Sequence, residues 1–342
     1  MTSAKLWIKR IAIGLLALVA VLLMIGAGYE ASMRRQTLVN YPVPGRLVDI
    51  GGRKIQLDCR GSGAPLVVLE AGLDMNGSLA WAKVHDSIAV TTRTCAYSRA
   101  GVMWSDDNPG QQSAVGIATD LQAALQGAGE KAPYVMVGHS LGGPYIMTFT
   151  KLHEADVAGL VFVDASHPEQ VQRFKEILGR ELEPPIGLMK VASALGWTGI
   201  VRVAMSGVPA TDSVRRTTSA YAPTSLGPML EELDAMDSTM AVAGGFRQLG
   251  NRPLVVLTAM APVDTATLKQ MKMTVEENVK FRGAWKELHD DEASWSTQSE
   301  HIEVPDATHY IQNDRPDIVI AAVRKVVALV RHPVTAPPAP LP

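Results

Sequence analysis

The feature that most constrains the fold is the alternation of short apolar runs with longer segments of helical periodicity. Strands are predicted for four apolar runs, PLVVLEAG, YVMVG, VAGLVFVDAS and RPLVVLTAM. Helices are predicted between them, for example in SAVGIATDLQAALQGAG and LGGPYIMTFTKLH. This order predicts an α/β fold whose mostly parallel sheet has helices on both faces. Residues from about 168 to 250 interrupt the alternation and are expected to form several helices.

The N-terminus carries a second strong signal, an uncharged apolar run at Ile11–Gly28 that is extended by Leu6, Trp7 and Ile8. About 20 apolar residues suffice to cross a bilayer as a helix. The run is longer than a usual signal-peptide core, and no clear A-x-A cleavage site follows it. We therefore predict an uncleaved signal anchor over residues 1–30, with a cleaved secretory signal as the alternative.

Charges beside this run predict its orientation. Lys5, Lys9 and Arg10 flank its start, whereas Glu30 and two arginines flank its end. This bias favours a cytoplasmic N-terminus and an extracytoplasmic, periplasmic location for the rest of the chain. We expect a juxtamembrane tether over 31–44, a folded domain over 45–332 and a mobile Pro-rich tail over 333–342.

Composition and motif content exclude several function classes. The formal net charge is −2 over 342 residues, and the sequence has no basic stripe, so no nucleic-acid partner is expected. The histidines and carboxylates lack metal-ligand spacing. No G-x-x-x-x-G-K-[ST] phosphate loop occurs. Neither a metal nor a cofactor is predicted.

One serine lies in the sequence Gly138-His139-Ser140-Leu141-Gly142, between a predicted strand and a predicted helix. This is the G-x-S-x-G pattern in the strand–turn–helix context that makes it a nucleophile site. Ser140 must occupy a tight turn so that its oxygen projects above the sheet. Gly138 and Gly142 leave room for that turn, and the next helix directs its partly positive N-terminus at a reacting carbonyl.

A serine hydroxyl needs an adjacent base to act as a nucleophile. The chain has eight histidines, and His309 alone follows the last predicted strand in a loop, VPDATHYIQNDRP, that precedes the last helix. That loop lies at the same edge of the sheet as the serine turn, outside the carboxyl ends of the strands. His309 is the predicted general base.

Two aspartates are candidates for the acid that orients the histidine, because each follows a strand between Ser140 and His309 in the chain. Asp164 ends the strand in GLVFVDASHP, where the backbone is firm, and is favoured. Asp264 follows RPLVVLTAMAPVD, the commoner strand for this acid, and remains the alternative. Asp306 is interpreted as a turn residue.

Backbone donors for a developing oxyanion are expected from two places. The N–H of Leu141 follows the serine directly, and the N–H of Leu73 lies in the loop after PLVVLEAG. The side chains of Glu70 and Asp74 in that region are interpreted as loop caps.

Taken together, these residues resemble the α/β-hydrolase fold family over roughly residues 44–332. The segments that carry the resemblance are EAGLDMNGSLAW, CAYSRAGVMWSD, GHSLGG, GLVFVDASHPEQ and THYIQNDRPDIVIAAV. They are similar to a bacterial branch of esterase/lipase-like hydrolases with an N-terminal membrane helix. The resemblance implies an eight-stranded type of sheet, and the recurring VDASHP segment supports Asp164. The chain departs from that branch at Ser98, where an aspartate is usual, and at Thr308, where a glycine is usual. Because Ser98 carries no charge, a salt bridge that the aspartate would form in the relatives is expected to be missing.

The resemblance also bears on the cysteines and on the interrupted region. It implies that Cys59 and Cys95 lie on neighbouring strands, either as a disulfide or as two packed thiols. It further implies that residues of about 168–250 form a cap over the site. Met229, Met236 and Met240 in that cap either help to line an acyl or alkyl pocket or only pack the cap helices.

The function expected from these features is a membrane-anchored serine hydrolase that cleaves small apolar carboxylic esters or acyl compounds through Ser140, His309 and Asp164. Its membrane contact would run through residues 6–28. The same residues also suit amide or C–C bond cleavage or a perhydrolase, and a catalytically silent binding or scaffold protein is the alternative of another class.

Overall fold

The structure is a computed structural model that describes residues 2–108, 110, 112–180, 186–206 and 212–333, with side chains from residue 5 onward. Its centre is an eight-stranded sheet in the order β1-β2-β4-β3-β5-β6-β7-β8. The strands are β1 (Arg46–Asp49), β2 (Lys54–Arg60), β3 (Leu66–Glu70), β4 (Thr94–Ser98), β5 (Tyr134–His139), β6 (Val157–Val163), β7 (Leu254–Ala259) and β8 (Ser299–Val304). Strands β1 and β2 run antiparallel to their neighbours, and the others pair in parallel. The expected mostly parallel α/β sheet is confirmed.

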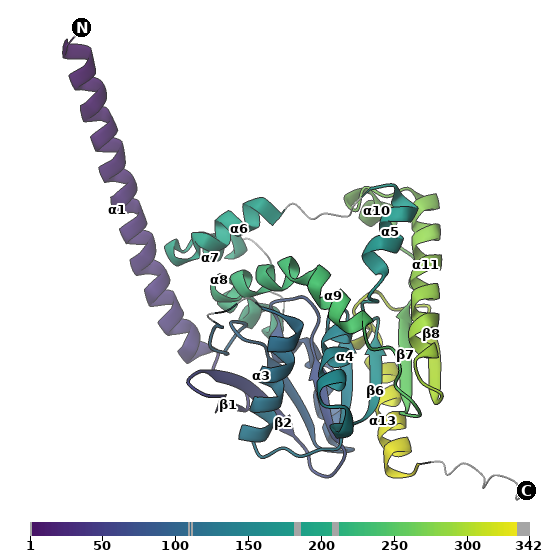
Figure 1. The fold of residues 1–342 in the computed structure, drawn as a ribbon. Helices are drawn as coiled ribbons and strands as arrows, with labels where there is room; N and C mark the ends of the chain where they lie inside the picture. Colours follow the sequence, from purple (N-terminus) through teal and green to yellow (C-terminus); the bar gives the residue numbers. More distant parts are fainter. Residues whose placement is uncertain (1, 109, 111, 181–185, 207–211, 334–342) are drawn as a thin grey trace, which may run out of the picture.

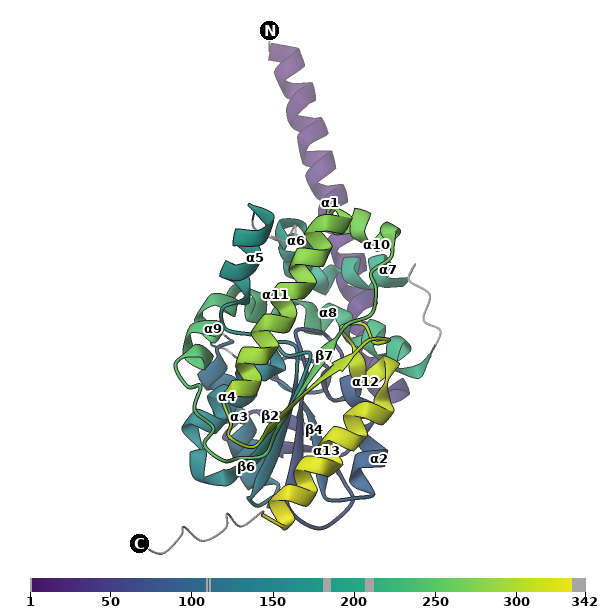
Figure 2. The same cartoon turned by 90° about the vertical axis from the view of Figure 1, so that its right-hand side faces the viewer.

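Helices cover both faces of the sheet because the strand residues alternate between two apolar cores. One core joins Met136 and Phe162 of the strands to α3 (Ala114–Gly127) and α4 (Gly142–Leu152). The other joins Val135 and Val161 to α13 (Pro316–Arg331) and the region of α2 (His85–Ala89). Figure 2 shows α13 and α2 on one side of the sheet and α3 and α4 on the other.

The interrupted region is a helical insertion between β6 and β7. It contains α5 (Gln170–Leu178), α6 (Ile186–Ala194), the short helix η3 (Gly196–Thr198), α7 (Ile200–Ser206), α8 (Ser213–Asp234) and α9 (Met236–Gly244). Beyond β7 come α10 (Thr265–Gln270), α11 (Val275–Ser294) and, after β8, α12 (Ile311–Asp314). In Figure 1, α6, α7 and α8 lie over one end of the sheet, and α5, α10 and α11 lie over the other.

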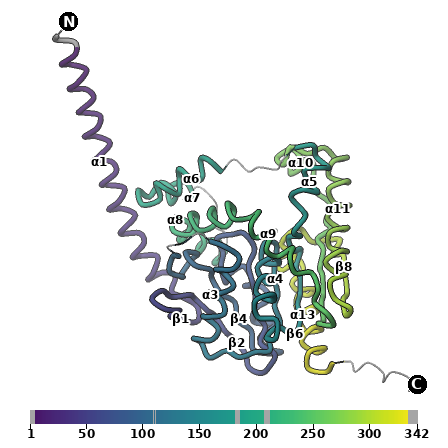
Figure 3. Tube along the Cα trace, in the orientation of Figure 1, coloured from purple at the N-terminus to yellow at the C-terminus, as the bar shows by residue number. Residues whose placement is uncertain are grey.

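Helix α1 (Thr2–Asn40) is one continuous helix that projects from the domain (Figures 1 and 3). At about 1.5 Å per residue it is roughly twice as long as the hydrocarbon core of a bilayer is thick. By length and composition it is the one helix of the described residues that qualifies as a membrane span. The segment 31–44, expected as a tether, is helical as far as Asn40; Thr37 is buried there, whereas most of residues 31–40 are exposed. The expected tail at 333–342 lies outside the described residues apart from Pro333.

The two cysteines are joined. Cys59 of β2 lies directly opposite Cys95 of β4 in the antiparallel register, with their Cα atoms 4.0 Å apart, and the two form a disulfide. Of the two alternatives left open by the sequence, the structure has the disulfide.

Candidate active site

Ser140 lies on a strained turn between β5 and α4. Its φ of +52° is in the left-handed region, which a residue with a side chain adopts only at an energetic cost. The turn is closed so tightly that a Cβ on Gly138 would lie 2.6 Å from the Gly142 oxygen, and one on Gly142 would lie 2.7 Å from the Ala71 oxygen. These contacts explain why glycines flank the serine, as the sequence predicted.

The predicted base and the favoured acid meet. His309 Nδ1 lies 2.6 Å from Asp164 Oδ2, across 145 residues of sequence. The Asp164 side chain is only 3% exposed, whereas that of His309 is 42% exposed. Because a carboxylate accepts, His309 donates through Nδ1–H, and its Nε2 is left free to accept a proton. His309 and Ser140 line the same cavity.

Asp164 is held by more than the histidine. Its Oδ1 accepts hydrogen bonds from the Ala259 backbone N–H at 2.8 Å and from the Trp285 indole at 2.9 Å. Burial by itself raises the pKa of Asp164, but the hydrogen bond and charge of His309 outweigh it and leave this pKa below its usual value. The residue therefore remains an anion that can stabilise a protonated imidazole.

Asp264, the alternative acid, has a different role. It is the N-cap of α10, where its Oδ1 accepts from the backbone N–H groups of Ala266 and Thr267 at 2.9 and 2.8 Å. It is exposed and lines the same cavity as Ser140, and its described hydrogen bonds remain within its own helix. Asp306, interpreted as a turn residue, pairs with Arg315 on the surface.

His139 contacts the loop that carries His309. Its Nε2 lies 2.9 Å from the backbone oxygen of His309, and the two rings are 4.7 Å apart. Burial and the neighbouring His309 lower the pKa of His139 to about 3. A carbonyl only accepts, so neutral His139 donates through Nε2–H and supports the His309 backbone.

The two predicted oxyanion donors are available. Within the described part of the chain, the backbone N–H groups of Leu141 and Leu73 donate to no protein acceptor. The loop that carries Leu73 lies against the serine, because a Cβ on Gly72 would be 2.9 Å from Ser140 Cβ. Two free donors beside a nucleophilic oxygen are what an oxyanion requires.

A cavity of about 460 Å³ leads away from Ser140 and His309. Its apolar wall is aromatic: the rings of Phe174 on α5 and Phe281 on α11 are 4.2 Å apart, and Trp285 lies 5.6 Å from Phe174. The size and lining suit a small, largely apolar molecule. The cap methionines do not line this cavity; Met229, Met236 and Met240 pack in apolar clusters, which is the packing alternative.

Comparison with known proteins identifies the family. Residues 58–322 match the family model described as the alpha/beta hydrolase family. The chain belongs to the alpha/beta hydrolase family. Among solved structures, this hydrolase is similar to a "probable hydrolytic enzyme" from Pseudomonas aeruginosa, with a TM-score of 0.62 and 18% identity over 82% of this chain and 93% of that one.

Two further relatives are informative. An esterase from Thermogutta terrifontis has a TM-score of 0.55 and 18% identity, covering 81% of this hydrolase and 94% of that chain. A curated protein of Hormonema carpetanum, named "Probable transporter efuK", is 38% identical over 128 residues, which are 35% of this chain and 18% of that one. The hydrolase thus spans about a fifth of the length of the first curated relatives it matches. At these identities the structural likeness establishes the fold.

A buried ion network next to the site was not foreseen from the sequence. Arg99 of this hydrolase donates to Glu70 Oε1 at 2.7 Å and to both carboxylate oxygens of Glu232 on α8 at 2.8 Å. It also donates to the backbone oxygens of Ala71 and Gly72 at 2.8 and 2.7 Å. Arg99 therefore ties the loop of the expected oxyanion donor to the cap.

This network corrects one expectation. Glu70 is an ion-pair partner of Arg99 and not a loop cap, and burial raises its pKa to about 7. Asp74 does cap its loop, accepting from the Asn76 N–H at 2.7 Å. The salt bridges of Arg99 do not involve position 98, where the Ser98 hydroxyl donates to Gln56 Oε1 at 2.8 Å.

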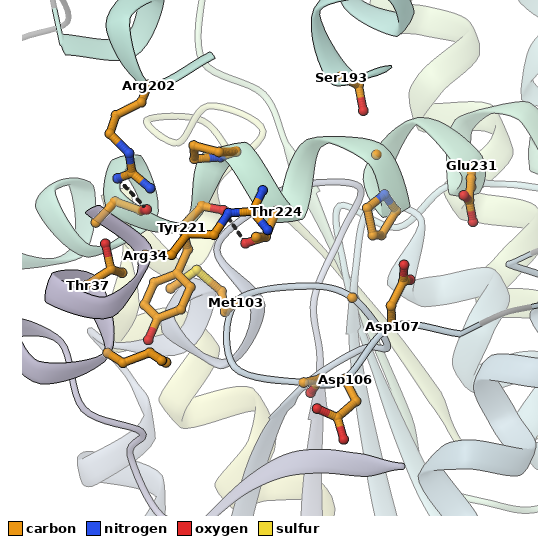
Figure 4. A pocket seen from close by; sticks show the side chains of 17 residues that line it. Arg34, Thr37, Met103, Asp106, Asp107, Ser193, Arg202, Tyr221, Thr224 and Glu231 are labelled. Atoms are coloured by element: carbon orange, nitrogen blue, oxygen red, sulfur yellow. Dashed lines mark hydrogen bonds between the residues drawn. The ribbon is translucent and has the colours of Figure 1, made fainter. Parts of the chain in front are cut away.

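A larger cavity of about 530 Å³ lies elsewhere in the hydrolase, at the junction of α1, α7 and α8. Figure 4 shows Arg34, Arg202 and Tyr221 on one side of it and Asp106 and Asp107 on another. It shares no described lining residue with the Ser140 cavity. The predicted residues Ser140, Asp164 and His309 all line the smaller cavity.

Sequence reasoning missed the aromatic wall and the indole that binds Asp164. Phe281, Trp285 and His289 recur every four residues along α11, which places them on one helix face. That spacing is visible in the sequence, although charged residues lie between the three rings. Its packing against β7 and α5 turns this face toward the site.

Proposed function

We propose that this hydrolase cleaves carboxylic esters through a Ser140–His309–Asp164 triad. His309 takes the proton from Ser140 as its oxygen attacks the ester carbonyl and then gives that proton to the departing alcohol. Water hydrolyses the acyl-enzyme with His309 again as base. The backbone N–H groups of Leu141 and Leu73 bind the oxyanion.

The observation that carries the proposal is the 2.6 Å contact of His309 Nδ1 with buried Asp164, in a cavity that also contains strained Ser140. Asp164 is preferred to Asp264, since Asp264 uses its carboxylate to cap α10. A scaffold without activity has no need for a positive φ at the serine, which stores strain.

The substrate class is inferred from the cavity. Phe174, Phe281 and Trp285 form an apolar wall that suits the acyl or alkyl part of a small ester. The likeness to an esterase of Thermogutta terrifontis agrees with this choice.

We further propose that α1 is an uncleaved membrane anchor through residues 6–28, as in the bacterial membrane-anchored branch that the sequence resembles. Lys5, Lys9 and Arg10 favour a cytoplasmic N-terminus, which puts the catalytic domain on the extracytoplasmic side. The Cys59–Cys95 disulfide suits that oxidising location.

Covalent labelling tests the proposal. A fluorophosphonate probe should modify the folded protein at Ser140, and the Ser140→Ala variant should remain unlabelled while it elutes and melts like the unchanged protein. p-Nitrophenyl esters of increasing acyl length should then be turned over by the unchanged protein only. Folded protein that neither takes the label nor cleaves any ester would contradict the proposal and favour the scaffold alternative.

A further inference from the structure

The insertion carries an apolar surface that no described part of the chain covers. Leu188 and Val191 on α6 and Leu195 just after it recur at helical spacing, and Leu188 is 80% exposed. Trp197 on η3 is 48% exposed, and Ile200 and Val203 of α7 continue the surface, with Val203 62% exposed. A cluster of apolar side chains exposed to water is unusual in a soluble domain and indicates a binding surface. We call these six residues the cap apolar surface.

The cap apolar surface is attached to α1 by close packing. A Cβ on Gly26 would lie 2.4 Å from the Thr198 oxygen, so the glycine allows η3 to touch the helix backbone. Glu30 of α1 accepts from Arg202 of α7 in two hydrogen bonds of 2.8 and 2.9 Å, and both side chains are buried. These contacts therefore fix the position of the cap apolar surface relative to helix α1.

These contacts determine where the cap apolar surface lies along the membrane normal if α1 spans a bilayer. Gly26 belongs to the last turn of the apolar run that ends at Gly28, so η3 lies where the chain would leave the hydrocarbon. Trp197 immediately precedes Thr198, and tryptophan is enriched at this interface. In Figures 1 and 2, α5, α6, α7 and α10 lie at the end of the domain from which the N-terminal half of α1 projects.

We propose that the cap apolar surface docks on the lipid bilayer that holds α1, so that the enzyme draws its ester substrate from the membrane. This inference rests on the proposed anchor and deepens the proposed function. The occupant is lipid because the surface is continuous with α1 where the anchor leaves the hydrocarbon. The cavity of Ser140 is lined by Phe174 of α5 and Thr267 of α10, and both helices lie at the same end of the domain.

Single labelled cysteines in the full chain test the docking. Leu188→Cys and Val203→Cys, labelled with an environment-sensitive fluorophore under non-reducing conditions, are reconstituted in phosphatidylcholine vesicles at low protein-to-lipid ratio. Both labels should shift to the blue and be quenched by brominated lipid. Val90→Cys is the matched control, because Val90 is 85% exposed at the end of α2, away from this face. Leu16→Cys reports on the anchor itself.

The outcomes separate the two proposals. If the labels at 188 and 203 behave like the label at 90 while the label at 16 is quenched, the docking proposal is overturned and the anchor proposal stands. An unquenched label at 16 overturns the anchor and the docking with it. If the labels at 188 and 203 shift to the blue but are not quenched by brominated lipid, and the shift grows with the protein-to-lipid ratio, a second copy of the chain covers the surface. That result overturns the lipid assignment.

Activity gives a second readout. The double variant Leu188→Glu/Val203→Glu should lose roughly tenfold or more of its turnover of a long-chain ester dissolved in vesicles, because each carboxylate opposes burial of the surface. Turnover of water-soluble p-nitrophenyl acetate should stay within about twofold, as should both activities of Val90→Glu. Equal losses on both esters would overturn the inference. Failure of the unchanged enzyme on both esters would refute the proposed function alone, since the fluorescence result does not depend on catalysis.

Discussion

At the scale of single residues, the site depends on which carboxylate meets His309. Asp164 itself has a φ of +45° directly after β6, so Ser140 and Asp164 both occupy strained backbone. Strain of this kind persists where the surrounding structure holds it, and here the Ala259 N–H and the Trp285 indole hold the carboxylate.

Replacing each aspartate by asparagine should distinguish the two candidates. Asp164→Asn should lower kcat for p-nitrophenyl esters by roughly 10³- to 10⁴-fold, because the amide no longer stabilises the protonated His309 or holds its tautomer. Asp264→Asn should change kcat less than about threefold, since asparagine caps a helix as well as aspartate does. A larger loss in the Asp264 variant would reverse the assignment.

At the scale of elements, α1 is attached to the insertion by a buried ion pair. Glu30 and Arg202 are almost fully inaccessible. Glu30 also accepts from Arg34 at 3.0 Å, so loss of Glu30 would leave buried Arg202 without a carboxylate, whereas loss of Arg202 would leave Glu30 with one cationic partner. This pair holds α1 against the insertion at Glu30, and Thr37 is the next buried residue of the helix, although most residues between the two are exposed. A soluble fragment should therefore begin ahead of Gly26.

A double-mutant cycle on this pair should show strong coupling. Glu30→Gln should lower the free energy of unfolding of the detergent-solubilised protein by about 3 kcal/mol, because buried Arg202 loses its carboxylate partner. Arg202→Met should lower it less, because Glu30 keeps Arg34 as a partner. The double variant should recover part of that loss. Strictly additive losses in thermal or chemical unfolding would mean that the pair is not coupled.

At the scale of the whole molecule, stability should depend on pH through two buried groups whose pKa values are shifted in opposite directions. Burial lowers the pKa of His289 to about 4, where its ring bridges Thr258 and the Ala165 oxygen. The unfolded chain binds this proton below about pH 6.5, so stability present above that pH is lost as the pH falls toward 4. Glu70, with its pKa raised to about 7, acts in reverse: it favours folding below about pH 4.5 and loses that effect as the pH rises through 7.

Two variants should separate these effects. Between pH 6.5 and 5, His289→Gln should flatten the acid loss of stability by about 1.4 kcal/mol per pH unit, measured from urea midpoints. Glu70→Gln should instead steepen it, because the opposing contribution is removed. Parallel stability curves for the unchanged protein and both variants would contradict the assigned charge states.

The amino-acid sequence by itself determined the features that depend on local spacing. The alternation of apolar runs predicted the sheet, and Gly138, Ser140 and Gly142 predicted the turn, because a tight backbone bend requires small neighbours within a few residues. His309 was recognisable from its position after the last strand. Only the tertiary structure placed Asp164, and not Asp264, against His309, paired Arg99 with Glu232, and turned Trp285 toward Asp164. These contacts join residues that are 121 to 145 positions apart, and no local pattern specifies them.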